Sequence, residues 1–387
     1  MSYIDKSQQW SFKKEASYGL VPTFNVVPGE DIIECINPTM DASTDLIERE
    51  VLKNSLVKDQ PIPGKETSSG SVGIETSSVI AGDLNGDLLY ESGMGAKIDV
   101  KASVDESGTA GTNTSTTINV TAASGEDYTV GQALKVLVDA TYEYLIVRSI
   151  ATDELTIAPA MTGTPTLVST VEGLISYTIA KPDTAAISFA IEEYFENASN
   201  QITYTYAGCV VSDMTVNYPV ANIVKTDFSI AGAGFDVASA VGDRESVCHS
   251  FDPYVAKNMT FNYDDVAYAV EDLSLNIASD IYDVEALTTD GLTNKVITGK
   301  SAVGGSFGLE YEGTALFTAF KNGTSGELYG LVSNVTTTAG MYAPNVIISQ
   351  SSKSVDSGIY KDSADFVCLS SAGCSDTVED ALTIFFS

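Results

Sequence analysis

The chain has 387 residues, of which 52 are acidic and 20 are basic, giving a formal net charge of −32. A protein this acidic repels nucleic acid, which excludes a broad nucleic-acid-binding surface. Apolar residues make up 44% of the chain and charged residues only 19%, so sizeable cores can form. Abundant Thr, Ser, Val, Gly and Tyr favour strands joined by tight turns, and the length predicts two or three domains.

The start of the chain lacks the apolar segment of a secretory signal, and no apolar run is long enough for a membrane-spanning helix. We therefore expect synthesis in a reducing cytoplasm, with cysteines that are free or buried. Their spacing fits no zinc motif or disulfide framework. The cysteines are Cys35, Cys209, Cys248, Cys368 and Cys374.

A repeated motif is the most informative feature of the sequence. Residues 64–75 read GKETSSGSVGIE and residues 299–310 read GKSAVGGSFGLE. The match continues upstream without a gap, which favours internal duplication over an accidental likeness of glycine-rich segments. The identical pairs of the motif are Gly64/Gly299, Lys65/Lys300, Gly70/Gly305, Ser71/Ser306, Gly73/Gly308 and Glu75/Glu310.

The two copies differ in length because of extra sequence between about 100 and 182. This segment opens with a Ser/Thr/Gly-rich linker at 105–117, and four strand-like runs follow, at 118–123, 133–140, 142–150 and 154–160. It is either a small inserted β-domain or a long decorated loop, and we favour the domain. The expected division is 1–100 with 183–245 as the first module, 101–182 as the insertion, and 246–387 as the second module.

Elsewhere the hydrophobic pattern mostly has a period of two. Residues 201–219 and 272–279 alternate as strands do, whereas 187–198 fits a strand or a helix. A short helix could end at Gly323, a typical C-cap residue. The sequence therefore predicts a mainly β protein with sandwich or barrel modules, each with at most one helix.

Candidate catalytic and metal-binding groups are few. The single histidine, His249, adjoins Cys248, but neighbouring side chains on a strand point to opposite faces. The segment DLNGD at 83–87 has its glycine and its twelfth residue at the wrong places for a calcium loop. Neither AGAGF (231–235) nor VGGSFG (303–308) completes a nucleotide-binding motif. We predict no enzyme activity, no metal and no cofactor.

Ordered segments of this chain resemble the tail tube proteins of long-tailed bacteriophages. The order is KKEASYGLVPTF (13–24), INPTMD (36–41), the first repeat motif, AGDLNGDLLYESGMG (81–95), YTYAGCVVSDMTVNY (204–218) and KTDFSIAG (225–232). The resemblance covers both modules but not the insertion. It implies β-sandwiches with a flanking helix, and it makes Cys209 a packing residue.

The same resemblance implies a structural virion protein that forms stacked rings around a DNA channel. A duplicated chain implies a homotrimeric ring of six quasi-equivalent modules, with the insertion on the tube exterior. The expected partners are further copies of itself, a terminator, a baseplate or tip, and a tape measure inside the tube. DNA passes without specific binding, and the expected location is the virion tail, assembled in the host cytoplasm.

Two polar segments, 41–65 and 280–300, would suit ring stacking by this resemblance, or else form exposed hairpins without a partner. The candidate contact residues are Asp45, Glu48, Arg49, Glu50, Lys53, Lys58, Asp280, Asp283 and Glu285.

Two other functions are open from the sequence. A glycan-binding or adhesion protein would need an exposed aromatic cluster, hinted at by Tyr142 and Tyr144. A hydrolase with a pair of carboxylates is possible in so acidic a chain, but nothing marks the pair.

Overall fold

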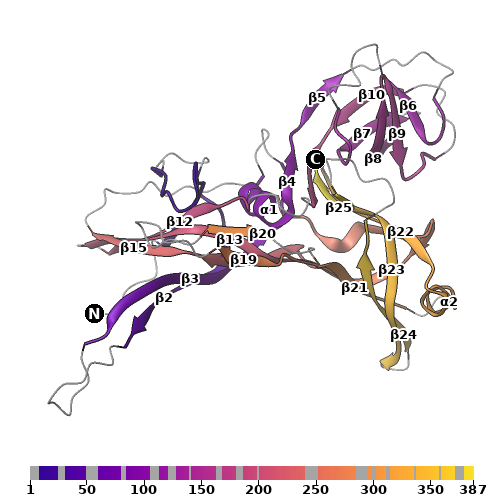
Figure 1. The fold of residues 1–387 in the computed structure, drawn as a ribbon. Coiled ribbons are helices and arrows are strands. Elements are labelled where there is room, and N and C mark those ends of the chain that lie inside the picture. The colour runs from indigo at the N-terminus through magenta and orange to yellow at the C-terminus, as the bar shows by residue number, and fades with distance from the viewer. Residues whose placement is uncertain are drawn as a thin grey trace.

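The computed structural model is mainly β, as the sequence predicts (Figure 1). It describes residues 8–24, 31–48, 60–79, 84–104, 113–120, 128–138, 141–162, 168–179, 186–197, 200–239, 252–284, 294–297, 302–310, 314–334, 337–356, 359–370 and 379–387. Two short α-helices, α1 (Asp87–Met94) and α2 (Ala315–Asn322), lie among these residues. The adjacent residues Cys248 and His249 lie outside them.

Strands of the first half form two antiparallel sheets that share one long strand, β13 (Asn200–Pro219). The second half of β13 lies in the order β2–β3–β14–β13, and its first half is flanked by β12 and β15, with β1 beyond β12. The partners are β1 (Gln8–Lys14), β2 (Ile36–Ile47), β3 (Ile62–Glu75), β12 (Phe189–Asn197), β14 (Lys225–Gly232) and β15 (Gly234–Ser239).

Strands of the second half pair in the same pattern around β23 (Thr338–Asp356). Here β18–β21–β24–β23 corresponds to β2–β3–β14–β13, and β16, β22 and β25 take the places of β1, β12 and β15. The strands are β16 (Met259–Tyr263), β18 (Val270–Ala278), β21 (Ala302–Glu310), β22 (Ser325–Ser333), β24 (Ile359–Cys368) and β25 (Glu379–Phe386).

The correspondence extends to single residues, because irregularities of the ladders recur at equivalent places. The β13–β14 register shifts between Val211 and Asp213, and the β23–β24 register shifts between Ile348 and Gln350. A second shift separates Phe189 from Ile191 in β12 and Gly326 from Leu328 in β22. β-Bulges are specific structural features, so their recurrence supports equivalence of the paired strands.

The main core lies between the two sheets of each half. In β3, the side chains of Val72 and Ile74 are fully buried, whereas Ser71 is exposed and Glu75 is half-buried, as expected for a strand with one face inward. Helix α1 is buried along Leu89, Tyr90 and Met94. Cys209 is fully buried, in agreement with its expected packing role. The remaining strands of the main body are β4 (Gly95–Ile98), β11 (Ile175–Ile179) and β17 (Val266–Tyr268).

A separate six-stranded sheet with its own apolar core forms within the segment expected to be an insertion (Figure 1). All four strand-like runs predicted there are confirmed as strands; the starts at 133 and 154 match, and the other boundaries differ by one to four residues. The strands are β5 (Lys101–Val104), β6 (Thr117–Asn119), β7 (Ala133–Val138), β8 (Thr141–Ala151), β9 (Glu154–Ala158) and β10 (Val168–Gly173).

Other local expectations have clear outcomes. The ambiguous segment 187–198 forms strand β12, and the predicted helix end at Gly323 is confirmed, with a left-handed φ of 62°. Helix α1, at 87–94, was not predicted. Its N-cap Gly86 offers no side-chain bond and its residues are buried on several sides, so it lacks the capping and amphipathic signals of a helix.

The repeat motif lies on equivalent strands of the two halves, β3 and β21. The first copy is described throughout. In the second copy Gly299 and Lys300 lie outside the described residues. The members placed by the structure are Gly64, Lys65, Gly70, Ser71, Gly73 and Glu75 on β3 and Gly305, Ser306, Gly308 and Glu310 on β21.

The motif glycines Gly70 and Gly305 have the same steric role in the two halves. A Cβ at Gly70 would collide with the carbonyl oxygen of Thr39 in β2, and one at Gly305 with the carbonyl oxygen of Ser274 in β18. Both contacts are with backbone, which cannot move away without disturbing a ladder. The two glycines therefore serve the same close approach of strands in each half.

The pair Gly73 and Gly308 is matched in sequence but has different neighbours in the two halves. A Cβ at Gly308 would collide with the Asp272 carboxylate of β18, whereas one at Gly73 would meet the Asp227 carboxylate of β14. The cause is the position of the bulge on the neighbouring strand. In β18 the register shifts between Val270 and Asp272, so Asp272 pairs with Gly308, whereas in β2 the shift lies between Ile36 and Thr39, so Gly73 pairs with Ile36. Gly308 is thus equivalent to Gly73 in sequence and strand but not in its contacts.

Gly305→Ala should lower the free energy of unfolding by about 1–3 kcal/mol, because the added methyl group forces β21 away from β18. The neighbouring motif residue provides the matched control, since Ser306→Ala removes only a half-buried hydroxyl and should change stability by about 0.5 kcal/mol or less. Urea unfolding of the three proteins measures both values. Equal stability of the two variants would contradict the steric explanation.

Candidate functional site

The two halves are joined by strand pairing inside the chain. Asp213–Pro219 of β13 pair antiparallel with Asp272–Ala278 of β18, over seven residue pairs. Three side chains of each segment point into the core and are buried, so the join is apolar as well as hydrogen-bonded. These are Met214, Val216 and Tyr218 on β13 and Leu273, Leu275 and Ile277 on β18.

This join produces one continuous eight-strand ladder across both halves, β2–β3–β14–β13–β18–β21–β24–β23. Among the described strands, β2 at one end pairs only with β3. At the other end, Gln350–Asp356 of β23 pair only with β24. Both edges have counterparts at the internal join. Strand β2 corresponds to β18, and Gln350–Asp356 of β23 correspond to the second half of β13.

A second contact between the halves surrounds helix α1. Strand β25 pairs with β11, and β11 pairs with β4, which directly follows α1. The Tyr90 ring lies 5.4 Å from Tyr177 of β11 and 5.1 Å from Phe386 of β25, between ring centroids. The Tyr90 hydroxyl also hydrogen-bonds with the Thr226 hydroxyl at 2.7 Å. Aromatic residues from both halves thus bury α1.

The eight-strand ladder presents a polar face opposite its core. The register places short polar side chains side by side across successive strands, and they are exposed or half-buried. Representative members are Thr39, Ser71, Ser229, Thr215, Asn276, Ser306, Ser363 and Ser352. Face membership depends on strand register, so sequence patterns within single strands could not assemble this surface.

Neighbouring polar side chains on this face bond to one another. Ser274 Oγ donates to Asn217 Oδ1 at 3.1 Å across the internal join, and Asn217 Nδ2 donates to Asp227 Oδ2 at 3.3 Å. The Thr39 and Ser71 hydroxyls lie 3.1 Å apart. Several donors are therefore already occupied within the face.

The charge of this polar face is mainly negative. Its acidic members include Asp41, Asp213, Asp227, Asp272 and Asp365, and its basic members include Lys225 and Lys361. Lys361 Nζ lies 2.8 Å from Glu271 Oε2, so part of its charge is compensated. Such a surface attracts phosphate groups weakly.

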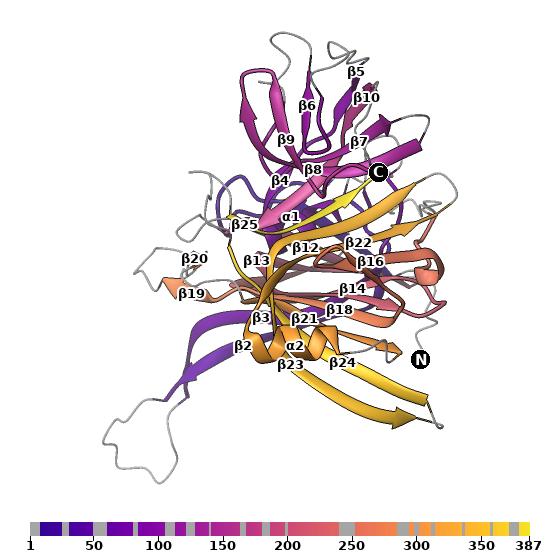
Figure 2. The same ribbon diagram turned by 90° about the vertical axis from the view of Figure 1, so that its right-hand side faces the viewer.

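Strands β2 and β3 extend beyond the sheet as a projecting hairpin (Figures 1 and 2). Of the proposed stacking residues, Asp45 and Glu48 lie here and are exposed, and Asp280 is exposed before β19 (Ile281–Val284), which pairs with β20 (Asn294–Ile297). Asp283 lies in β19. The candidates Arg49, Glu50, Lys53, Lys58 and Glu285 lie outside the described residues.

The hairpin also carries exposed apolar side chains that the charge-based selection missed: Leu46, Ile47 and Ile62. Their exposure on a projecting element makes them contact candidates alongside the charged residues. The available signal was the set of apolar residues that segment 41–65 contains among its polar ones.

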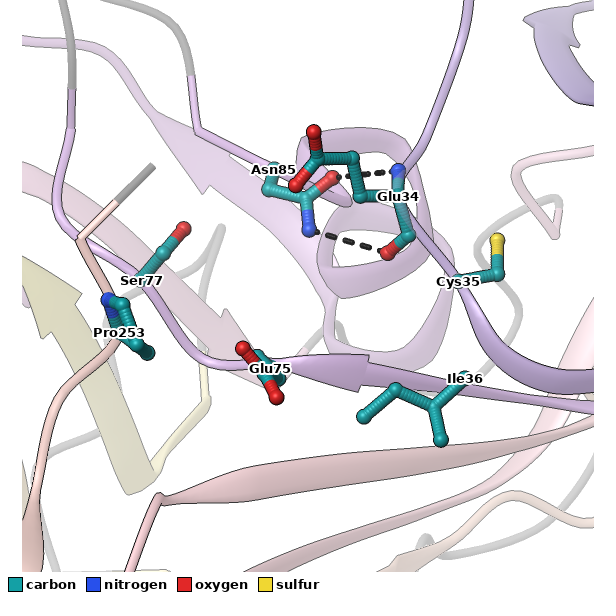
Figure 3. A pocket seen from close by; sticks show the side chains of 7 residues that line it. All are labelled: Glu34, Cys35, Ile36, Glu75, Ser77, Asn85 and Pro253. Carbon is teal, nitrogen blue, oxygen red and sulfur yellow. Dashed lines mark hydrogen bonds between the residues drawn. The ribbon is translucent and has the colours of Figure 1, made fainter. Parts of the chain in front are cut away.

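One pocket of about 220 Å³ lies beside the start of β2 and the end of β3 (Figure 3). Asn85 and the Glu34 backbone exchange two hydrogen bonds on one side of it, at 3.1 and 3.2 Å. Burial, with a smaller contribution from the Glu34 charge, raises the pKa of the Cys35 thiol to about 12. The thiol is therefore protonated at neutral pH and is a poor nucleophile.

Most of the other candidate site residues take part in structural contacts within the fold. Asp87 of the calcium-like segment accepts a bond from the Tyr177 hydroxyl and pairs with Lys97 Nζ at 2.6 Å. Tyr144 stacks on Phe385, whereas Tyr142 is exposed under Lys135. Within the described residues, no cluster of His, Cys, Asp and Glu could hold a metal, and neither helix could cross a membrane.

A family model described as phage tail tube protein matches residues 7–359. The chain belongs to this phage tail tube family. The match spans the first half, the six-stranded sheet and the second half as far as the start of β24, and it confirms the resemblance seen in the sequence. This tail tube protein is accordingly a structural component of the virion tail. The search of curated proteins found no match.

Helix α1 should make the tail tube protein sensitive to alkaline pH. Burial raises the pKa of Tyr90 to about 12, against hydrogen bonds from Thr226 and Thr76 that lower it. The unfolded chain ionises this phenol near pH 10, so its contribution to stability is complete below pH 10 and is lost as pH rises to about 12. Tyr90→Phe should reduce that alkaline loss by roughly 2–3 kcal/mol.

Chemical unfolding at several pH values between 8 and 12 measures this difference. Tyr142→Phe, at an exposed phenol, is the control and should keep the wild-type pH dependence. An unchanged alkaline loss in Tyr90→Phe would contradict the assignment.

Proposed function

We propose that three copies of this tail tube protein join edge to edge into a closed ring, and that rings stack into a channel for DNA. The chain would comprise two tail-tube modules, 1–100 with 183–245 and 246–387, and an inserted β-domain at 101–182 on the tube exterior. The function needs no catalysis and no cofactor. The observation that carries the proposal is the internal β13–β18 join, whose two counterparts lie at opposite ends of the ladder.

The internal join supplies a template for the contact between copies. The open segment Gln350–Asp356 of β23 corresponds to Asp213–Pro219 of β13, and β2 corresponds to β18. A copy that presents β23 to the β2 of its neighbour would repeat the same antiparallel pairing. Contacts between unlike surfaces close into a ring when the rotation is suitable, and closure leaves no strand edge unpaired.

Three ladders of eight strands would give a barrel of about 24 strands, wide enough for an interior channel. The polar, mainly negative face is the candidate lining, since the opposite face forms the core. This face carries few Lys or Arg side chains. DNA that touches it would release few of its counterions, so little binding energy would result. Stacking of rings would use the β2–β3 hairpin and the segment 280–300, with the apolar residues Leu46, Ile47 and Ile62 added to the charged candidates.

The partners proposed from the family remain the same: further copies of the chain, a terminator, a baseplate or tip, and a tape measure inside the tube. Assembly would take place in the host cytoplasm. The alternative glycan-binding function gains little support, because Tyr144 is committed to packing against Phe385.

The internal β13–β18 join predicts which residues of β23 and β2 face each other between two copies, and a disulfide can test this register. Asn217 pairs with Ser274 inside the chain, and the equivalent residues between copies are Ser354 and Thr39. The double variant Ser354→Cys/Thr39→Cys should therefore form covalent trimers under oxidising conditions, visible on a non-reducing gel. Both positions are exposed, so neither change should disturb the fold.

The matched control combines Ser354→Cys with Ser43→Cys, which lies four residues further along β2. That displacement is roughly 13 Å, too long for a disulfide. Crosslinking of the control alone would refute the register, and a covalent series continuing beyond the trimer would refute closure by three copies. Electron microscopy of the same samples checks that rings are present.

The proposed lining predicts how tubes respond to added cations. Assembled wild-type tubes should show no measurable affinity for short duplex DNA in fluorescence anisotropy, because the lining is mainly negative. Asp227→Lys should produce binding that weakens steeply with salt, since each new phosphate contact releases counterions.

Glu154→Lys, at an exposed position in the six-stranded sheet, changes the net charge equally outside the proposed lining. It should bind DNA less than Asp227→Lys by about tenfold or more. Equal binding by the two variants would reject this face as the lining.

A further inference from the structure

The second helix, α2, has an apolar surface that the rest of the chain leaves exposed. Phe317 is 45% exposed and Phe320 is 36% exposed, and their ring centroids lie 6.2 Å apart. Only Leu316 of this helix is buried. In the first half, by contrast, the helix at the same place in the topology, α1, is buried along most of its length.

The other half of the chain covers one side of α1, whereas first-half residues such as Phe228 of β14 cover another. The Phe386 ring of β25 lies against Tyr90 of α1 and 6.0 Å from Tyr177 of β11. Ile384, two residues earlier on the same face of β25, is 1% exposed. The internal join therefore has two parts, the β13–β18 pairing and the packing of β25 on α1.

The counterpart of β25 in the first half is β15, and its equivalent side chain is exposed. Ile384 pairs with Met341 of β23, and Val237 pairs with the equivalent residue of β13, Tyr204. Val237 is 53% exposed, whereas Ile384 is covered. Strand β15 thus lacks within one chain the cover that β25 receives from α1 and β11.

These two uncovered surfaces lie at opposite ends of the molecule (Figure 1), and α2 lies on the outside of the strands of its half (Figure 2). They belong to the same two ends as the open edges of β23 and β2. We propose that Phe317 and Phe320 of one copy pack against β15 of a second copy, with Val237 at the contact. The inference rests on the proposed ring and adds a helix-to-strand contact to its strand pairing.

The contact between copies would differ from the internal one in a single respect. Strands β4 and β11 stand between α1 and β12 and add a pairing with β25, whereas α2 ends at Asn322 and β22 begins at Ser325. The second copy would therefore be held on α2 by side chains, without a further strand. This makes the two phenylalanines the main apolar component of that contact.

Photo-crosslinking tests the identity of the occupant. With p-benzoylphenylalanine at position 317, assembled protein should give an intermolecular adduct that mass spectrometry maps to Gly234–Ser239. The same amino acid at position 142, an exposed tyrosine of the six-stranded sheet, is the control and should give no adduct to those residues. Adducts to another surface of the chain, to another polypeptide, or to none would overturn the contact.

A charge exchange provides a second, independent test. Phe317→Lys and Val237→Asp should each raise the concentration needed for assembly at least about tenfold, because each places a charge against an apolar surface. Combining them should restore assembly to near the wild-type concentration. Both positions are exposed, so the melting temperature of the unassembled chain serves as the folding control. Single variants that assemble like the wild type would overturn the proposal.

Assembly of the wild-type protein distinguishes failure of this contact from failure of the proposed ring. If wild-type protein forms no ring under any condition, both proposals fail. If it forms rings crosslinked through positions 354 and 39 while the position-317 adduct maps elsewhere, only the contact between α2 and β15 fails.

Discussion

The need to pair every strand edge governs this structure. A strand edge left in water invites association, and the chain satisfies one pair of edges internally by joining β13 to β18. Because the second half repeats this topology, the counterparts of the two joined strands lie at the ends of the ladder, as β2 and the end of β23. The repeated topology therefore gives a chain in which β13 and β18 are paired internally, while their counterparts, the end of β23 and β2, form the two outer edges of the ladder.

The internal and external edges differ in chemistry as their exposure requires. At the internal join the inward side chains Met214 and Val216 are buried, and their equivalents on β23 are Ser351 and Lys353. A join formed during folding is permanently covered and can be apolar. An edge that is exposed before assembly must stay soluble, and lysine on an edge strand is one common means of preventing unwanted pairing.

The segment that forms the six-stranded sheet contributes to the contact between the two halves. The main-body strands on either side of it, β4 and β11, pair with each other, and β11 pairs with β25 of the second half. Its body is anchored to the same half, where the Tyr329 hydroxyl donates to the Tyr144 carbonyl at 2.7 Å and Phe385 stacks on the Tyr144 ring. This segment and the strands beside it therefore bind the second half through both strand pairing and an aromatic cluster.

Sequence patterns predicted the parts of this fold that depend on local chemistry. Alternation located the strands at 201–219 and 272–279, and Gly323 located a helix end. The motif revealed the relation between β3 and β21, because Gly70 and Gly305 meet equivalent carbonyl oxygens that tolerate no side chain.

Identity of residues in the motif did not guarantee identity of surroundings. Gly308 meets the Asp272 side chain because the bulge of β18 lies one step away from the bulge of β2, which no comparison of the two motif copies could show. Beyond the motif, equivalent positions such as Met214 and Ser351 have diverged in chemistry. The wider correspondence of the halves therefore required the ladder registers.

The polar face was beyond sequence analysis for the same reason, and its composition follows from its geometry. Each strand contributes only a few members, and bulges in β13 and β23 shift which residues reach the face. Short side chains suit a surface whose donors are occupied by neighbours, as the Ser274 hydroxyl donates to Asn217 Oδ1 and Asn217 Nδ2 donates to Asp227. If this face lines the proposed channel, long cationic side chains there would bind phosphate in every ring, whereas short hydroxyl, amide and carboxylate groups would bind it weakly.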